Sequence, residues 1–232
     1  MIGSVNSKFS SISLMNNDAV IAGQAVYSKR VLSLYDFWVL GVSNHFFWKC
    51  PTRLISEKFK SCVSDNHLDV GVGTGYYLKK HLPKNTRRIA LLDLNSNSLA
   101  STANAIKWFN PESYCANVFE PLSLDCERFD SISVNYLLHC LPGNMKDKAS
   151  VFGNLKALLF DGGSLFGSTI LGKGVPHNML GNKLMHFYNK KGIFTNLDDN
   201  IEELREALNT HFSNVEIELH GCVAIFSAKK VK

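Results

Sequence analysis

Short apolar runs alternate with amphipathic stretches from residue 65 onward. The apolar runs have the length of strands that are buried on both faces of a sheet, and they are 67–72, 87–94, 113–119, 129–138 and 162–171. Between them, apolar residues recur three and four positions apart, which predicts helices at 76–82, 97–109 and 145–160. This alternation predicts an α/β fold, with a mostly parallel sheet covered by helices on both faces.

The two ends of the chain follow other patterns. Residues 1–18 are rich in Ser and Asn and are expected to be mobile, whereas residues 19–64 carry helical spacing and predict an N-terminal helical cap. Residues 172–197 contain glycines and aromatic residues and predict an insertion on the substrate side, with a short helix near 182–189. Residues 198–232 predict a final helix, starting near 197, and two antiparallel strands that turn at Gly221. The prediction is one domain spanning 1–232, with residues 65–171 forming the ligand-binding sheet.

Composition narrows the class of protein. The chain has 232 residues, of which 45% are hydrophobic, and its net charge is only +5, which excludes a disordered chain. The basic residues are scattered, with four isolated doublets and a short basic tail at 229–232, so binding to nucleic acid is not expected. No run reaches the about 18 apolar residues of a membrane helix, and the N-terminus lacks the apolar segment of a signal peptide. The six cysteines form no CxxC motif and the histidines show no ligand spacing, so we expect no metal site. Several cysteines lie within apolar runs, as reduced buried thiols do, and we expect a cytoplasmic location.

A glycine-rich loop follows the first predicted strand. Gly71, Gly73 and Gly75 allow a ligand to approach the backbone closely, and Asp93 ends the second strand, where a carboxylate can receive ribose hydroxyls. A dinucleotide site would carry a further glycine where Tyr76 stands. Asp69, two residues before the loop, repels a pyrophosphate but suits an ammonium group. A ligand with an amine and a ribose but no phosphate is therefore expected, and S-adenosylmethionine meets both conditions.

Three segments resemble motifs of a known family. LDVGVGTG, LLDLN and NYLLHCLPG look like motifs I, II and IV of the class I S-adenosylmethionine-dependent methyltransferases. The resemblance extends over about residues 65–230 and implies a Rossmann-like seven-stranded sheet with an antiparallel C-terminal strand pair. Residues 35–51 resemble the N-terminal cap of the ubiquinone and menaquinone biosynthesis methyltransferases.

The resemblance also implies roles for individual residues. Asp69 and the three loop glycines would hold the methionine part of the cofactor, and Asp93 would hold the ribose. The remaining cofactor contacts implied by the resemblance are Leu94, Asn117 and Val118 around adenine, and Asn135 beside the sulfonium. Tyr136 would flank the acceptor. Leu94 and Val118 would be interpreted as core residues if they did not stand beside these motifs.

The acceptor site has weaker signals. His139 follows the fourth predicted strand, and its side chain titrates near neutral pH, so it is the candidate general base; a hydrogen-bonded structural histidine is the alternative. Tyr136 either orients the acceptor or packs in the core. Further candidates for the acceptor pocket are Tyr27, Tyr35, Trp38 and His177, with core packing as the alternative for the aromatic residues.

The predicted function is methyl transfer from S-adenosylmethionine to a small molecule by in-line displacement, which leaves S-adenosylhomocysteine. O- or N-methylation is favoured, and C-methylation is possible because of the similarity to the quinone enzymes. Methylation of RNA or protein and cofactor binding without methylation are the alternatives. Residues 135–138 read Asn-Tyr-Leu-Leu instead of the Asp/Asn-Pro-Pro-Tyr typical of base methylation in DNA. A dehydrogenase is disfavoured because Tyr76 stands where its dinucleotide-binding loop would carry a glycine.

Overall fold

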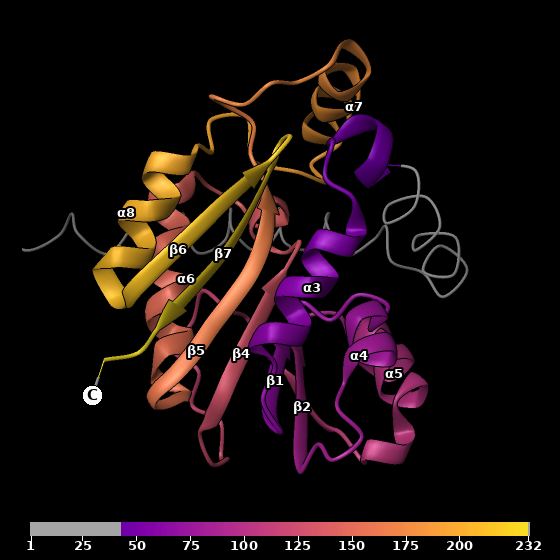
Figure 1. Cartoon of the computed structure of the whole chain (residues 1–232), viewed down its shortest axis with the longest axis vertical. Coiled ribbons are helices and arrows are strands. Elements are labelled where there is room, and N and C mark those ends of the chain that lie inside the picture. The colour runs from indigo at the N-terminus through magenta and orange to yellow at the C-terminus, as the bar shows by residue number, and fades with distance from the viewer. Residues whose placement is uncertain (1–42, 232) are drawn as a thin grey trace, which may run out of the picture.

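A computed structural model describes residues 43–231 and shows one seven-stranded sheet with the order β3-β2-β1-β4-β5-β7-β6 (Figure 1). The strands are β1 (Asn66–Val70), β2 (Arg88–Asp93), β3 (Glu112–Cys115), β4 (Phe129–Asn135), β5 (Leu159–Ile170), β6 (Ser213–His220) and β7 (Val223–Lys229). The first five pair in parallel, whereas β7 is antiparallel to both β5 and β6. The predicted Rossmann-like sheet with an antiparallel C-terminal pair is therefore confirmed.

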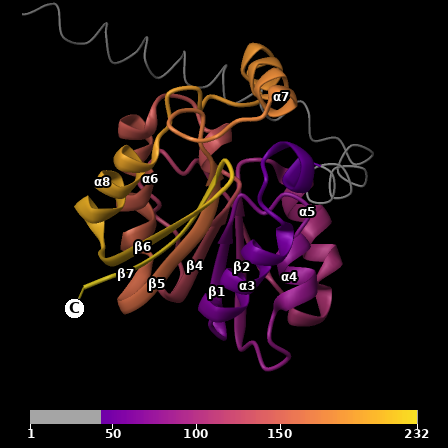
Figure 2. The same cartoon turned by 45° about the horizontal axis from the view of Figure 1, so that its top comes forward.

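Helices cover both faces of this sheet. One face carries α3 (Thr52–Cys62), α4 (Tyr76–His81) and α5 (Ser96–Ala105), and the other carries α6 (Met145–Ala157) and α8 (Ile201–His211) (Figure 1). The remaining long helix, α7 (Met179–Lys190), lies beyond the carboxyl ends of the parallel strands (Figures 1 and 2). Ligands of open α/β sheets bind at that edge, so α7 lies close to where a site is expected.

The alternation of side chains along the strands builds a separate core on each face. Leu68 and Val134 belong to the core that α6 and α8 complete with Phe152 and Leu208. On the opposite face, strand residues such as Leu91 and Phe166 pack with Phe59 of α3, Leu78 of α4 and Leu99 of α5. Burial on both faces explains why the middle of β2 is a continuous apolar run in the sequence.

Two element boundaries differ from the predictions because a polar side chain bonds the backbone, and a third differs at the end of α6. Strand β3 ends at Cys115 instead of residue 119, because the Asn117 side chain accepts a hydrogen bond from the Phe119 amide (3.1 Å) and turns the chain. Helix α8 begins at Ile201 and not near 197, because the Asn200 side chain caps it through the Glu203 amide (2.9 Å). Helix α6 ends at Ala157, and β5 starts at Leu159 within the predicted helix.

The N-terminal cap is only partly described. Residues 19–42, which include Tyr27, Tyr35 and Trp38, lie outside the described residues. The later part of the predicted cap contains α3, which packs along a face of the sheet and buries Phe59 completely. Trp48 is also buried, with its ring 6.1 Å from that of Phe194 in the segment after β5. Among the described helices, none is long and apolar enough to span a membrane.

Candidate functional site

The strand order places the predicted cofactor motifs side by side. Strands β2, β1 and β4 are neighbours, so their carboxyl ends carry the glycine loop, Asp93 and Asn135 to the same edge of the sheet. The Gly71 amide donates to the Leu92 carbonyl (2.8 Å), which joins the start of the loop to β2. A side chain at Gly71 would come within 3.0 Å of Leu137, so the loop also lies against the end of β4.

The loop leaves open space in front of its backbone. Gly71, Gly73 and Gly75 all have positive φ (72°, 52° and 69°), a conformation that side chains with a Cβ disfavour. A Cβ on Gly73 would have no described atom within 4 Å, whereas one on Gly75 would lie 2.6 Å from Thr102 Cγ2. Gly75 therefore allows α4 to start against α5, and Gly73 presents bare backbone to a ligand.

The Asp93 carboxylate ties the loop to the end of β2. Its Oδ1 accepts the Asn95 amide (2.8 Å). Burial raises the pKa of Asp93, and hydrogen bonds from the backbone amides of Asn95, Gly73, Val72 and Leu94 oppose that shift. A carboxylate has about four acceptor positions, so ribose hydroxyls would share the two oxygens with these amides. Leu94, the next residue, is partly buried beside it.

Asp69 is a buried carboxylate behind the loop. Only 8% of it is exposed, and Oδ1 accepts a hydrogen bond from the Ser133 hydroxyl. Burial raises the pKa of Asp69 to about 7; the Ser133 bond opposes this shift and the Asp93 charge adds to it. A cationic ligand would favour the ionised carboxylate, so two acidic groups at this position suit an ammonium group and disfavour a phosphate.

Asn135 provides an unsatisfied donor at the end of β4. Its Oδ1 accepts the Ser168 hydroxyl (3.1 Å), while its buried Nδ2 has no hydrogen-bond partner within residues 43–231. Buried polar groups normally have partners, so such a donor indicates a place for an acceptor group of a ligand. The open loop, the two carboxylates and this amide together fit S-adenosylmethionine.

Tyr136 is held in a strained backbone conformation. Its φ is +58°, which is rare for a bulky residue and costs about 1–3 kcal/mol. The hydroxyl donates to Asn44 Oδ1 (2.8 Å), and Asn44 Nδ2 donates to Thr52 Oγ1 (2.9 Å). The N-terminal segment therefore positions Tyr136. Asn44 could not be identified from the sequence, because no sequence pattern connects it with Tyr136, 92 positions away.

His139 is buried beside Tyr136 in a hydrogen-bonded position. Its Nδ1 accepts the Ile170 amide (3.3 Å), so the ring proton is on Nε2. Burial, helped by the Lys148 charge, lowers the pKa of His139 to about 3. Its ring packs edge-on against those of Phe194 (4.5 Å) and Tyr136 (5.4 Å). In this state the Nε2–H can donate a hydrogen bond, but neither nitrogen is free to take a proton.

The other predicted site residues have partners within the chain. The Asn117 side chain bonds Phe119 and Glu120 in its own turn. Val118 belongs to the core under α6. His177 Nε2 lies 3.0 Å from the Gly172 carbonyl, and its Nδ1 lies 3.2 Å from Cys222 Sγ. These contacts give His177 a role in holding the segment after β5, and its contact with an acceptor stays a prediction.

Removing the Asp93 carboxylate should weaken cofactor binding without unfolding the protein. We expect Asp93→Ala to bind S-adenosylmethionine with a free energy about 1–3 kcal/mol less favourable, because buried loop amides and ribose hydroxyls lose their acceptor. Isothermal titration calorimetry measures this change. Affinity equal to that of the wild-type protein would remove Asp93 from the cofactor site.

Comparison with known proteins agrees with this geometry. A family model described as a methyltransferase domain matches residues 68–165. The chain is 39% identical over 210 residues to the demethylluteothin O-methyltransferase of Streptomyces thioluteus. The alignment covers 90% of this chain and 91% of that protein. It is 37% identical over 188 residues to the N-methyltransferase vrtF of Penicillium aethiopicum, covering 80% and 78% of the two chains.

A solved structure has the same fold at low sequence identity. The N-methyltransferase NodS from Bradyrhizobium japonicum WM9, in complex with S-adenosyl-L-homocysteine, matches with a TM-score of 0.64 and 16% identity over 91% of this chain and 99% of that one. The chain belongs to the class I S-adenosylmethionine-dependent methyltransferases.

Proposed function

We propose that the protein methylates an acidic hydroxyl group, a phenol or an enol, on a small molecule. The observation that carries this proposal is the state of His139, which is neutral and has its Nδ1 occupied by the Ile170 amide. The bound cofactor supplies the methyl group, on a positively charged sulfur. The residues of the chain then have to orient the acceptor oxygen and keep water away from it.

We propose that the His139 Nε2–H lies next to the nucleophile, where a donor favours oxygen over nitrogen. An ionised hydroxyl oxygen has several lone pairs, so it can accept the His139 Nε2–H and still attack the methyl carbon. A neutral amine has a single lone pair, and a hydrogen bond to it would block the attack. The same donor stabilises a phenolate or enolate, because hydrogen bonds to charged acceptors are the stronger ones. Since His139 takes no proton in this state, the acceptor is expected to lose its own proton readily.

Matched acceptors test this preference. We expect turnover with aromatic hydroxyl compounds, such as naphthols, and much slower turnover with the corresponding naphthylamines and naphthylmethanols. The measurement is S-adenosylhomocysteine formation, with mass spectrometry of the methylated product. Faster reaction of the amines would contradict O-methylation and support the second candidate, N-methylation, which the similarity to an N-methyltransferase favours.

Two substitutions of His139 separate hydrogen-bond donation from base catalysis. His139→Gln keeps an N–H donor near the Nε2 position and should retain most of the kcat/KM, whereas His139→Phe should lose about 5- to 150-fold, the value of one buried hydrogen bond. A general base would be missing from both variants, and each would lose about 10²- to 10⁴-fold. Equally large losses of kcat/KM in both variants would therefore support His139 as the general base.

The remaining parts of the proposal concern setting and partners. The expected lack of nucleic-acid binding fits the scattered basic residues of the sequence, and the proposed cytoplasmic location fits the cysteines within apolar runs, where reduced buried thiols are common. Tyr27, Tyr35, Trp38 and His177 are proposed to contact the acceptor, and Leu94, Asn117 and Val118 to contact adenine. Salt-dependent binding to RNA or DNA would contradict the small-molecule assignment.

A further inference from the structure

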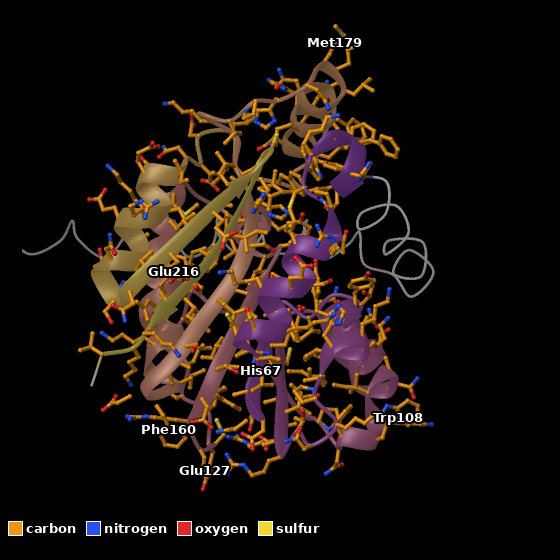
Figure 3. The ribbon with its side chains drawn as sticks, in the orientation of Figure 1. His67, Trp108, Glu127, Phe160, Met179 and Glu216 are labelled. Carbon is orange, nitrogen blue, oxygen red and sulfur yellow. The ribbon has the colours of Figure 1, made fainter. Side chains whose placement is uncertain are left out.

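A chain of polar side chains runs through the core behind Asp69. His67 is fully buried where α3 packs over the sheet (Figure 3). Its Nδ1 lies 2.7 Å from Ser131 Oγ and its Nε2 lies 2.9 Å from Ser133 Oγ. The Ser133 hydroxyl bonds Asp69. Cross-strand register explains the arrangement, because His67 pairs with Ser131 and Asp69 pairs with Ser133 on neighbouring parallel strands.

The chemistry of these groups fixes which partner donates in each of these hydrogen bonds. Ser133 has a single hydroxyl proton, which it donates to the Asp69 carboxylate, so it must accept from His67 Nε2–H. Burial lowers the pKa of His67 to about 3, so the ring is neutral and Nδ1 accepts from the Ser131 hydroxyl. The Ser64 amide in turn donates to Ser131 Oγ (2.9 Å). The Ser64 hydroxyl, which donates to the Asn66 carbonyl (2.8 Å), also lies 2.7 Å from Ser131 Oγ. From His67 onward, each donor points toward Asp69.

We propose that Ser131, His67 and Ser133 are positioning residues that hold Asp69 ionised and rotated to bind the ammonium group of the cofactor. This inference rests on the proposed role of Asp69 in cofactor binding. Because His67 occupies a lone pair of the Ser133 oxygen, the hydroxyl stays aimed at Asp69 Oδ1. Oδ2 is then the oxygen expected to meet the ammonium group.

The surroundings explain why Asp69 needs such support. Burial and the negative charge of Asp93 on β2 both favour protonation of Asp69, and the Ser133 bond opposes them. Helix α3 and strand β5 place the apolar rings of Phe59 and Phe166 against His67. From α4, the ring of His81 packs near that of Phe59. Burial lowers the pKa of His81, and the charges of Lys60 and Lys80 lower it further. Ser133 is thus the group that opposes the protonation of Asp69 on this face.

Cofactor affinity as a function of pH tests the proposal. We would titrate S-adenosylhomocysteine by calorimetry between pH 6.0 and 7.5, where its α-amine stays mostly charged. Affinity should fall toward low pH in the wild-type protein. In Ser133→Ala the midpoint should move up by about one pH unit, so the affinity ratio to wild type should grow about threefold between pH 7.5 and pH 6.0. A merely structural loss would give a ratio that does not change with pH.

Three further proteins complete the experiment. His67→Met should shift the midpoint in the same direction, whereas His67→Gln, which keeps a donor near Nε2, should restore most of the wild-type profile. Ser164→Ala is the matched control, because Ser164 sits beside Ser131 in β5 and its hydroxyl instead accepts from Lys229 (2.6 Å). It should leave the profile unchanged.

The outcomes separate this inference from the role of Asp69 itself. If Asp69→Asn weakens binding but Ser133→Ala leaves the pH profile unchanged, the positioning chain is overturned and the Asp69 assignment stands. If Asp69→Asn binds as tightly as wild type, the underlying assignment fails. Nitrogen-15 NMR of the wild-type protein needs no variant: His67 should carry its proton on Nε2 throughout this pH range, and a proton on Nδ1 would overturn the direction of the chain.

Discussion

The Asp69→Asn variant should bind S-adenosylmethionine about 30- to 5,000-fold more weakly than the wild-type protein. Removing one charge from a buried, hydrogen-bonded charge pair costs about 2–5 kcal/mol, and every 1.4 kcal/mol is a factor of ten in affinity. Asn keeps the shape of the side chain and can still accept from Ser133, so the loss reports on the charge. Isothermal titration calorimetry with S-adenosylmethionine and S-adenosylhomocysteine measures it.

A matched control for this substitution lies near the opposite edge of the sheet. Asp130 is near the start of β4, is half-buried, and its carboxylate lies 3.5 Å from Arg87 Nη2. Asp130→Asn makes the same chemical change far from the glycine loop and should bind the cofactor like wild type. An Asp69→Asn affinity within about threefold of wild type would contradict the assignment of Asp69 to the ammonium group.

The Lys148→Met variant should lose about 3–5 kcal/mol of its free energy of unfolding. The Lys148 Nζ is fully buried and donates to Asp199 Oδ2 (2.6 Å) and to the Thr195 carbonyl (2.7 Å). In the part of the chain that the structure describes, Asp199 Oδ1 has no hydrogen-bond partner, so without Lys148 the carboxylate would be buried uncompensated. The pair joins α6 to the segment that bonds His139 through the Thr195 amide (2.8 Å).

A double variant distinguishes the lost charge balance from lost packing. Lys148→Met combined with Asp199→Leu replaces both partners by apolar groups, and such replacements are often neutral or stabilising. We expect urea denaturation to show the double variant clearly more stable than Lys148→Met alone. If the single variant unfolds like wild type, or the double variant is no more stable than the single one, the ion pair does not hold this segment.

Patterns within one segment were sufficient to predict the fold and to propose residues for the cofactor site. The apolar runs and the spacing between them predicted the five parallel strands, and β2 shows the clearest run because it is covered on both faces. Gly71, Gly73, Gly75 and Asp93 could be proposed as cofactor residues because a close ligand approach and the tip of a strand restrict the residue type locally. The strand order then brought these residues to one edge.

Relations between distant segments could not be predicted in this way. Ser131 and Ser133 have the appearance of ordinary polar positions of a strand, and only the register with β1 places them on either side of His67. Lys148 lies among charged residues of a helix, which suggests exposure, yet it is fully buried with Asp199. For His139 the sequence indicated the residue type but not its tautomer, which depends on the Ile170 amide.

A crystal structure with bound S-adenosylhomocysteine tests the central claim, that the carboxyl edge of β1, β2 and β4 holds the cofactor. We predict that its amino group lies within hydrogen-bond distance of Asp69 and its ribose hydroxyls within hydrogen-bond distance of Asp93, with the nucleoside against the backbone of Gly73. A ligand bound elsewhere, or an amino group with no contact to Asp69, would contradict the account.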